Sequence, residues 1–433
     1  MSMTRTGLRT ALAATSLLVL IAGSTTIEGQ TSSSDSHVTF TKDVAPIFQR
    51  ACQTCHRPGQ MAPMSLQTYA EVRPWARSIK QKVSTREMPP WYLDRSIGIQ
   101  QFENDASLTD GEIDTISAWV DAGAPQGNLA DMPAPREFDD SNRWTLPGGE
   151  PDLVVYAPEH RVKANSHEEW LDLHADIPLT EDRWVRAYEA KPAKAAIPVV
   201  HHLVVSLIQP DGTIEGYGFQ YAPGKPATVY PEDSGWLLKA GSSLRFEMHY
   251  SPTDEPRMDR SALAFQFYPK GYVPKKKAVR HNWMSLSDLD LPAGETNIRH
   301  DSYRRLDENF RLMTYLPHMH TLGQRQCVEL IYPSGEVEML NCFDFNFGWQ
   351  IVYQYEKTAQ PLIPKGTMIH AIHYHDNSIA NPLNPDPENW TGYGMRTIDD
   401  MAITMAEGIV LTDEEFAQAQ QERAEALAGQ TQN

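Results

Sequence analysis

Short runs of hydrophobic residues, broken by turn residues, make up most of the chain from residue 151 to 411. These runs are rich in β-branched and aromatic residues and include LVVY, RWVRAY, VVHHLVVSLI, LRFEMHY and ALAFQFY. Short strands separated by proline and glycine are typical of β-sandwiches, and one sandwich usually needs only about 100 residues. The pattern therefore predicts two all-β sandwiches, at residues 151–288 and 289–411.

A helical pattern precedes this region. The segment VAPIFQR at 44–50 has the spacing of an amphipathic helix. Thr109 and Glu112 form a T-x-x-E capping box, which indicates the start of a second helix. We therefore predict a small all-α domain at residues 38–127.

Three other segments differ from these domains. Residues 1–30 have the pattern of an export signal, in which Arg5 and Arg9 precede an apolar stretch of about 13 residues. A membrane span takes about 20 residues, so we predict a cleaved signal peptide, with a retained anchor as the alternative. Residues 128–150 are rich in proline, glycine and acidic residues and are predicted to be a linker. Residues 412–433 are predicted to be a polar tail, either helical or disordered.

The net charge of the chain argues against one class of binding partner. The 433 residues carry a formal net charge of -18 at pH 7. A polyanion would be repelled by this charge, so we predict no nucleic-acid partner. The basic run Lys275–Lys277 follows a proline and reads as a solvated turn. Because no other segment is apolar enough to span a bilayer, the export signal predicts a periplasmic or secreted protein.

Two of the four cysteines lie in the sequence CQTCH, at Cys52, Cys55 and His56. C-x-x-C-H is the pattern of covalent c-type haem attachment, in which the thiols take the vinyl groups and the histidine takes the iron. A redox pair would need a βαβ context and a zinc site would need a second C-x-x-C nearby, and the sequence offers neither. The 38–127 domain therefore resembles a class I cytochrome c with one covalent haem.

A methionine is expected as the second axial ligand of this haem, and three methionines compete for the role. Met61 and Met64 follow His56 by five and eight residues, too closely to reach the opposite haem face. Met88 stands in REMPPW, where two prolines stiffen the backbone. We predict Met88 as the ligand; the alternative is that all three side chains only fill gaps in the core.

The other two cysteines are predicted to pair. Cys327 lies in RQCVELIYP and Cys342 in EVEMLNCFDF, two runs with strand character that meet at Ser334–Gly335. A hairpin centred on this turn places the two cysteines opposite each other. In an exported protein they should form a disulfide, although two separate buried thiols are the alternative.

Histidines supply the candidate metal ligands of the second sandwich. His318 and His320 stand in LPHMHTLG beside a run with strand character, where residues two apart point to the same side. Both imidazoles could reach one ion, and imidazole suits zinc, copper, nickel and iron alike. Met401, in the acidic run IDDM, is a candidate third ligand, because a soft thioether favours Cu(I).

The first sandwich carries a second candidate group. His201 and His202 are adjacent and would face opposite sides of a regular strand, so a shared ion requires an irregular backbone, which the nearby Pro198 favours. His249 lies in another strand-like run, and three nitrogen ligands suit copper. Packing without metal is the simpler alternative for each group. A rival cluster in IHAIHYH, able to bind metal or to support other ligands, consists of His370, His373 and His375.

The order of these motifs resembles a known family. RWVRAYEAKP, VVHHLVV, LRFEMHYSP, HMHTLG, DNSIANPLNPDP and TIDDM, over about residues 150–410, are similar to the copper type II, ascorbate-dependent monooxygenases. That family includes dopamine β-monooxygenase and the peptidylglycine α-hydroxylating monooxygenase. The resemblance implies two jelly-roll-like sandwiches with one copper ion each. The implied ligands are His201, His202 and His249 for an electron-transfer copper, and His318, His320 and Met401 for a catalytic, dioxygen-activating copper.

The implied activity is hydroxylation of a C–H bond, in which one atom of dioxygen enters the organic substrate and the other leaves as water. The fused haem suggests that an exported electron donor, a redox protein or a small reductant, reduces the haem and the haem reduces the first copper. Met405 stands where the peptide-hydroxylating relative has a substrate-binding tyrosine, so peptide amidation is not expected and the substrate is unknown. The alternatives are a non-catalytic haem and copper electron carrier or copper-binding protein, and a cytochrome fused to a structural β module without copper.

Overall fold

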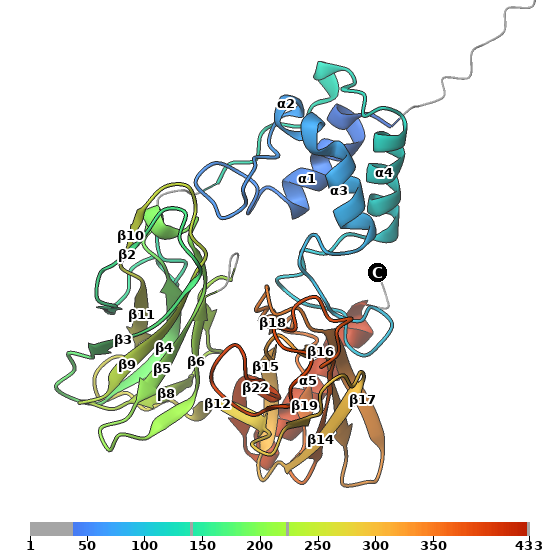
Figure 1. The fold of residues 1–433 in the computed structure, drawn as a ribbon. Coiled ribbons are helices and arrows are strands. Elements are labelled where there is room, and N and C mark those ends of the chain that lie inside the picture. Colours follow the sequence, from blue (N-terminus) through green and yellow to red (C-terminus); the bar gives the residue numbers. More distant parts are fainter. Residues whose placement is uncertain (1–37, 139–141, 222–224, 431–433) are drawn as a thin grey trace, which may run out of the picture. The chain divides into compact units, whose positions relative to one another are not determined.

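The computed structural model describes residues 38–138, 142–221 and 225–430 (Figure 1). The predicted export signal at 1–30 lies outside the described residues. None of the helices in the described ranges combines the length and the apolar composition that a membrane crossing requires.

An α-helical region comes first along the chain. Its elements are η1 (Phe40–Val44), α1 (Ala45–Ala51), α2 (Tyr69–Val72), η2 (Arg73–Trp75), α3 (Ala76–Ser84), α4 (Asp110–Asp121) and η3 (Leu129–Asp131). The predicted capping box is confirmed: the Thr109 hydroxyl accepts a hydrogen bond from the Glu112 amide, and the Glu112 carboxylate accepts one from the Thr109 amide. The first helix begins as one π-helical turn, and Phe40, Phe48 and Trp119 form the centre of the core.

The next region is a β-sandwich. One sheet has the order β3-β9-β5-β6 and the facing strands have the order β1-β11-β4-β8. The strand bounds are β1 (Leu153–Tyr156), β3 (Glu169–Asp176), β4 (Arg183–Lys191), β5 (Val200–Ile208), β6 (Ile214–Tyr221), β8 (Ser234–Leu238), β9 (Ser243–Tyr250) and β11 (Ala262–Phe267). Short strands at its margins are β2 (His160–Val162), β7 (Thr228–Val229) and β10 (Arg257–Asp259). All five predicted runs are strands, and Phe219, Phe246 and Phe265 are buried between the sheets.

A second sandwich follows. One sheet has the order β14-β20-β16-β17, and the facing strands have the order β12-β22-β15-β18. The bounds are β12 (Lys276–Ser285), β14 (Ile298–Arg305), β15 (Asn309–His318), β16 (Gly323–Ile331), β17 (Val337–Asp344), β18 (Tyr353–Gln354), β20 (Met368–His375) and β22 (Ile403–Leu411). Smaller strands are β13 (Asp290–Leu291), β19 (Leu362–Ile363) and β21 (Thr391–Gly392).

One sheet runs through both regions, because β12 hydrogen-bonds on two sides. Its first residues pair in parallel with β8, and the stretch from Ala278 to Ser285 pairs antiparallel with β22. By hydrogen bonding, β12 therefore belongs mainly to the second sandwich, although it precedes the predicted boundary at 288. Glu407 of β22 also accepts hydrogen bonds from the hydroxyls of Tyr188 and Tyr230, at 2.9 and 2.5 Å.

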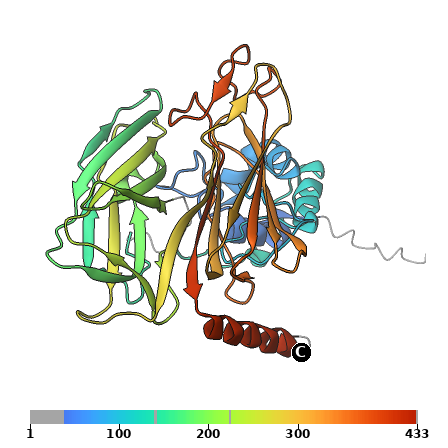
Figure 2. The same cartoon turned by 90° about the horizontal axis from the view of Figure 1, so that it is seen from below.

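The segments predicted as linker and tail both contact the β-structure. Leu146, inside the 128–150 segment, is buried against Ala187 and Ala264. The tail forms the helix α5 (Asp413–Gln430), which follows β22 (Figure 2). Phe416 of this helix is buried in a hydrophobic cluster, so the polar tail is anchored at its first turn.

The hairpin of β16 and β17 carries the disulfide. Cys327 lies opposite Cys342, and the two are joined by a disulfide across 15 residues of sequence. The register shifts between Val328 and Glu329, so the pairing nearer the turn differs by one residue from a regular hairpin.

Replacing both Cys327 and Cys342 with serine should lower the free energy of unfolding by about 3 kcal/mol, because the unfolded chain gains conformational entropy when the cross-link is absent. Urea unfolding followed by circular dichroism under oxidising conditions measures this difference. In the presence of a strong reductant the wild type and the variant should have the same midpoint; a difference that persists there would assign the loss to packing.

Candidate metal centre

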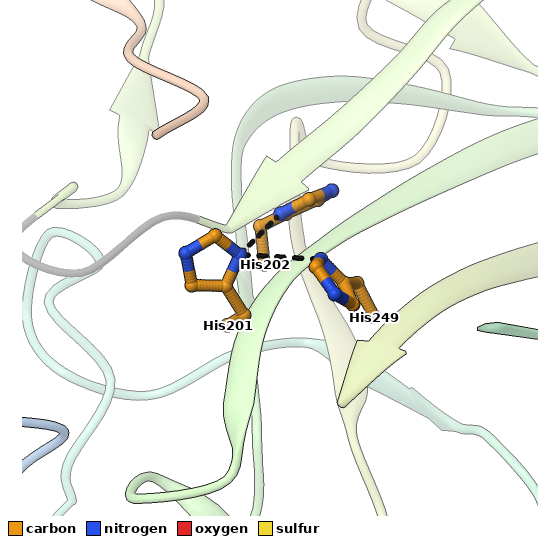
Figure 3. A group of neighbouring side chains, drawn as sticks. All are labelled: His201, His202 and His249. Carbon is orange, nitrogen blue, oxygen red and sulfur yellow. Dashed lines mark hydrogen bonds between the residues drawn. The ribbon is translucent and has the colours of Figure 1, made fainter. Parts of the chain in front are cut away.

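His201 and His202 reach one site because β5 bulges between them. On the neighbouring strand β9, Tyr250 pairs with Val200 and His249 pairs with His202, so two residues of β9 oppose three residues of β5. His201 is the extra residue. A bulge re-aims a side chain and breaks strict alternation, so adjacent histidines turn toward the same site. Figure 3 shows the three imidazoles gathered at this point.

The three rings have the spacing of metal ligands. The Nδ1 atom of His201 lies 3.2 Å from Nδ1 of His202 and 3.2 Å from Nδ1 of His249. Two nitrogens bound to one ion at about 2.0 Å, with a near-tetrahedral angle, lie about 3.3 Å apart. Among the described residues, these histidines are the one group of three or more His, Cys, Asp or Glu placed to share a metal ion, with ligand atoms within 4.8 Å of one another. The geometry fits a three-nitrogen metal site.

Residues around His249 fix its ring. The Nε2 atom of His249 lies 3.1 Å from a carboxylate oxygen of Glu168, so Nε2–H donates and Nδ1 holds the lone pair. Carboxylate–histidine pairs of this kind orient metal ligands and raise their basicity. Trp170, opposite His249 on β3, stacks on the imidazole with ring centroids 3.6 Å apart. Neither contact could be predicted from the sequence, because the pairing of β3 with β9 brings Trp170, and Glu168 just before β3, to His249.

The environment keeps this group uncharged at neutral pH. Burial, followed by repulsion from His249, lowers the pKa of His201 to about 4. Burial also lowers the pKa of His202 well below its ordinary value, with repulsion from the neighbouring histidines adding to the effect. Neutral imidazoles are the form that binds metal, so the ligands need not lose protons at pH 7.

The second predicted group is only partly brought together. The rings of His318 and His320 have centroids 5.4 Å apart and are nearly perpendicular. Nδ1 of His320 donates to the Asp399 carbonyl at 2.9 Å, and Nδ1 of His318 lies 3.1 Å from the side-chain oxygen of Gln350. In this tautomer the lone pair of each ring is on Nε2, the nitrogen that would bind an ion. Met401 is buried and lies two residues before β22. The first residue of β22, Ile403, pairs with His318.

One segment, residues 346–350, contacts both histidine groups. Trp349 packs against His201 with ring centroids 5.7 Å apart, and Gln350 is the partner of His318. Phe347 lies 6.0 Å from Trp170 and 6.1 Å from His320 between ring centroids. The two candidate sites therefore share neighbours, a feature that motif spacing could not indicate.

The rival cluster of β20 is divided between the two faces of its sheet. His370 faces outward and contacts the carboxylates of Glu329 and Asp301, both at 2.7 Å. His373 and His375 face inward and are fully buried, and burial lowers the pKa of His373 to about 3. His375 donates from Nε2 to the Met401 carbonyl at 3.1 Å, which places it beside the second site as a supporting residue.

The C-x-x-C-H residues lie in a turn after α1. Nδ1 of His56 donates to the Met64 carbonyl at 3.2 Å, which leaves the lone pair on Nε2, the nitrogen that would bind iron. Cys52 and Cys55 are unbridged thiols, and burial raises the pKa of Cys52 to about 12. These residues fit a covalent haem, which would convert both thiols to thioethers. Met88 is half-buried after α3, and its peptide bond to Pro89 is cis.

Comparisons with known proteins identify no family. No family model and no curated protein matches the chain. Among solved structures, a Bacteroides ovatus protein assigned as an α-L-fucosidase is 10% identical with a TM-score of 0.17, covering 69% of this chain and 43% of its own. The exported protein XepA is 9% identical with a TM-score of 0.15, covering 66% and 98%. A Bacillus subtilis oxalate decarboxylase variant is 8% identical with a TM-score of 0.13, covering 63% and 76%. Likenesses this weak carry no argument about function.

The low pKa of His201 predicts a pH dependence of stability for the metal-free protein. The unfolded state binds the proton at about pH 6.5 and the folded state only near pH 4, so the free energy of unfolding should fall as the pH drops from 6.5 to 4. Urea unfolding at several pH values, in the presence of a chelator, measures this slope. A His201→Gln variant cannot titrate at this position and should show a shallower slope; an equal slope would contradict the assignment.

Proposed function

We propose that the chain is an exported, copper-dependent monooxygenase that hydroxylates a C–H bond of a small organic substrate with dioxygen. The observation that carries the proposal is the three-histidine group built by the bulge in β5, with Glu168 behind His249. A regular strand would point the adjacent histidines to opposite faces, and the bulge brings both into one site with three nitrogen ligands. The motif resemblance supplies the metal and the reaction class.

The residues have distinct roles in this proposal. His201, His202 and His249 hold the electron-transfer copper, and Glu168 and Trp170 keep the His249 ring in place. A separate set, held by the second sandwich, binds the copper that meets dioxygen; its members are His318, His320 and Met401. When bound, the two copper ions supply two electrons, and with two protons these reduce one oxygen atom to water while the other enters the substrate.

The chemistry of the proposed ligands supports this division. Imidazole nitrogens suit an ion that changes between Cu(I) and Cu(II), and a thioether favours Cu(I), the state that reacts with dioxygen. The two rings of the second site direct their Nδ1 atoms to the Asp399 carbonyl and the Gln350 amide, so both present Nε2. The resulting His₂Met set is the softer of the two.

The fused haem is proposed as the entry point for electrons. A cavity of about 750 Å³ is lined by Cys55 and Met61 from the C-x-x-C-H turn and by Tyr221 and Pro198 from the first sandwich. Pro198 lies three residues before His201. Tyr221 of β6 pairs with Leu203 of β5, the strand that also carries His201. This arrangement supports an electron route from the haem, reduced by an exported donor, to the first histidine site.

Metal analysis of the full chain tests the proposal. We expect one iron and two copper ions per chain by mass spectrometry, and one copper ion in both a His318→Ala and a His249→Ala variant. The matched control is His370→Ala, which removes an outward-facing histidine of the second sandwich and should keep both ions. A wild-type protein that takes up no copper after reconstitution would overturn the proposal.

Oxygen uptake separates an enzyme from an electron carrier. The ascorbate-reduced protein should consume more dioxygen when a mixture of small organic C–H substrates is added, and His318→Ala should lose this increment. A wild type whose uptake never responds to any substrate in the mixture would favour the non-catalytic carrier.

The haem route predicts that a reduced haem passes one electron to the first site. After flash reduction of the haem, its reduced absorbance should decay while one Cu(II) electron paramagnetic resonance signal disappears. In His249→Ala, which lacks the first ion, the haem should stay reduced. Decay at the wild-type rate in that variant would exclude the route, and a Cys52→Ala/Cys55→Ala variant should show no haem signal at all.

A further inference from the structure

We propose that Asp400 is the positioning residue of the second metal site, where one buried carboxylate places both His320 and Met401 and is itself held by His375. This inference rests on the function proposed above, because it concerns the ligands of that site. Asp400 was not among the residues indicated by the sequence; it stands in the run IDDM only as the neighbour of Met401.

The carboxylate of Asp400 gathers backbone groups from two separate segments. Oδ1 accepts hydrogen bonds from the amide of His320 at 2.9 Å and from the amide of Met401 at 2.7 Å. Oδ2 accepts one from the amide of Leu322 at 2.8 Å. One segment is the turn after β15 and the other is the approach to β22. The carboxylate thus fixes the backbone of two of the three proposed ligands.

Burial makes this arrangement specific. Asp400 is completely buried, and a carboxylate out of water is stable only when its oxygens are fully hydrogen-bonded. The Nε2 atom of His375, also fully buried, lies 3.4 Å from Oδ1 and donates to the Met401 carbonyl at 3.1 Å. Asp400 thus holds the amide of Met401, and His375 holds the carbonyl of the same residue.

Asp399, the residue before Asp400, also contacts His320. The Asp399 carbonyl accepts from the imidazole Nδ1 of His320, while Asp400 accepts from the backbone of the same histidine. The ring and the main chain of His320 are thus both fixed by residues 399 and 400. His318 differs, because it lies on β15 itself and is placed by pairing with β22. Loss of the Asp400 carboxylate should therefore disturb His320 and Met401 more than His318.

An Asp400→Asn variant tests the role. Asparagine presents one acceptor oxygen and an NH₂ group. The NH₂ group cannot accept hydrogen bonds, so the backbone amides that now bond to one of the two carboxylate oxygens lose their acceptor. Supporting residues of metal ligands typically change affinity by about 10- to 100-fold, so we expect the Cu(I) affinity of the second site to fall by about that factor. Competition with a chromophoric Cu(I) chelator measures it. X-ray absorption of the Cu(I) protein should show a weakened copper–sulfur contribution.

Asp301→Asn is the matched control. Asp301 also pairs with a histidine of β20, His370, but on the outward face of the sheet. It should keep the wild-type Cu(I) affinity and sulfur contribution. If Asp400→Asn is too unstable to purify, His375→Gln replaces the test, since it keeps a donor near Asp400; a smaller fall in the same direction is expected, again with the first site unchanged.

The outcomes separate this inference from the proposed function. If Asp400→Asn lowers the melting temperature but leaves Cu(I) affinity and sulfur ligation unchanged, the residue is only structural and the inference is overturned. If the His318→Ala and His320→Ala variants bind as much copper as the wild type, the second site itself is absent and the proposed function fails first. A loss confined to the second site in Asp400→Asn, with the first copper retained, supports the positioning role.

Discussion

The irregular pairing of β5 with β9 is the constraint on which the candidate metal chemistry depends. A strand that alternates regularly would send His201 and His202 to opposite faces of the sheet. One extra residue between Val200 and His202 turns both toward His249, and burial then keeps the rings neutral. The first site is therefore a property of backbone register, and its ligands cannot be moved apart without removing the bulge.

The framework around the sites is a continuous sheet. Because β12 pairs with β8 and then with β22, strands of both sandwiches are fixed relative to each other by backbone hydrogen bonds. The buried carboxylate of Glu407 on β22 also accepts hydrogen bonds from Tyr188 of β4 and from Tyr230, both in the first sandwich region. A site built on strands of this kind is held more firmly than one carried by loops. The second site combines both, since His318 is on β15 and His320 is on the turn after it.

Local sequence patterns predicted the strands, the capping box at Thr109 and the pairing of Cys327 with Cys342, because each depends on residues close in sequence or on one turn. The irregular backbone at the histidine pair was also expected, from the neighbouring proline. Glu168, Gln350 and Asp400 left no such signal. Each acts through a contact between segments that are far apart in the sequence. An acidic or amide residue in a polar run also has no periodicity that separates a buried role from a solvated one.

The segment 346–350 gives the two candidate sites a common physical neighbour. Trp349 lies against His201, and Gln350 contacts His318. Binding at one site that shifts this segment changes the free energy of binding at the other, and thermodynamic linkage makes the change equal in both directions. Metal ions bound at the two proposed sites would then be coupled through the five residues of this loop.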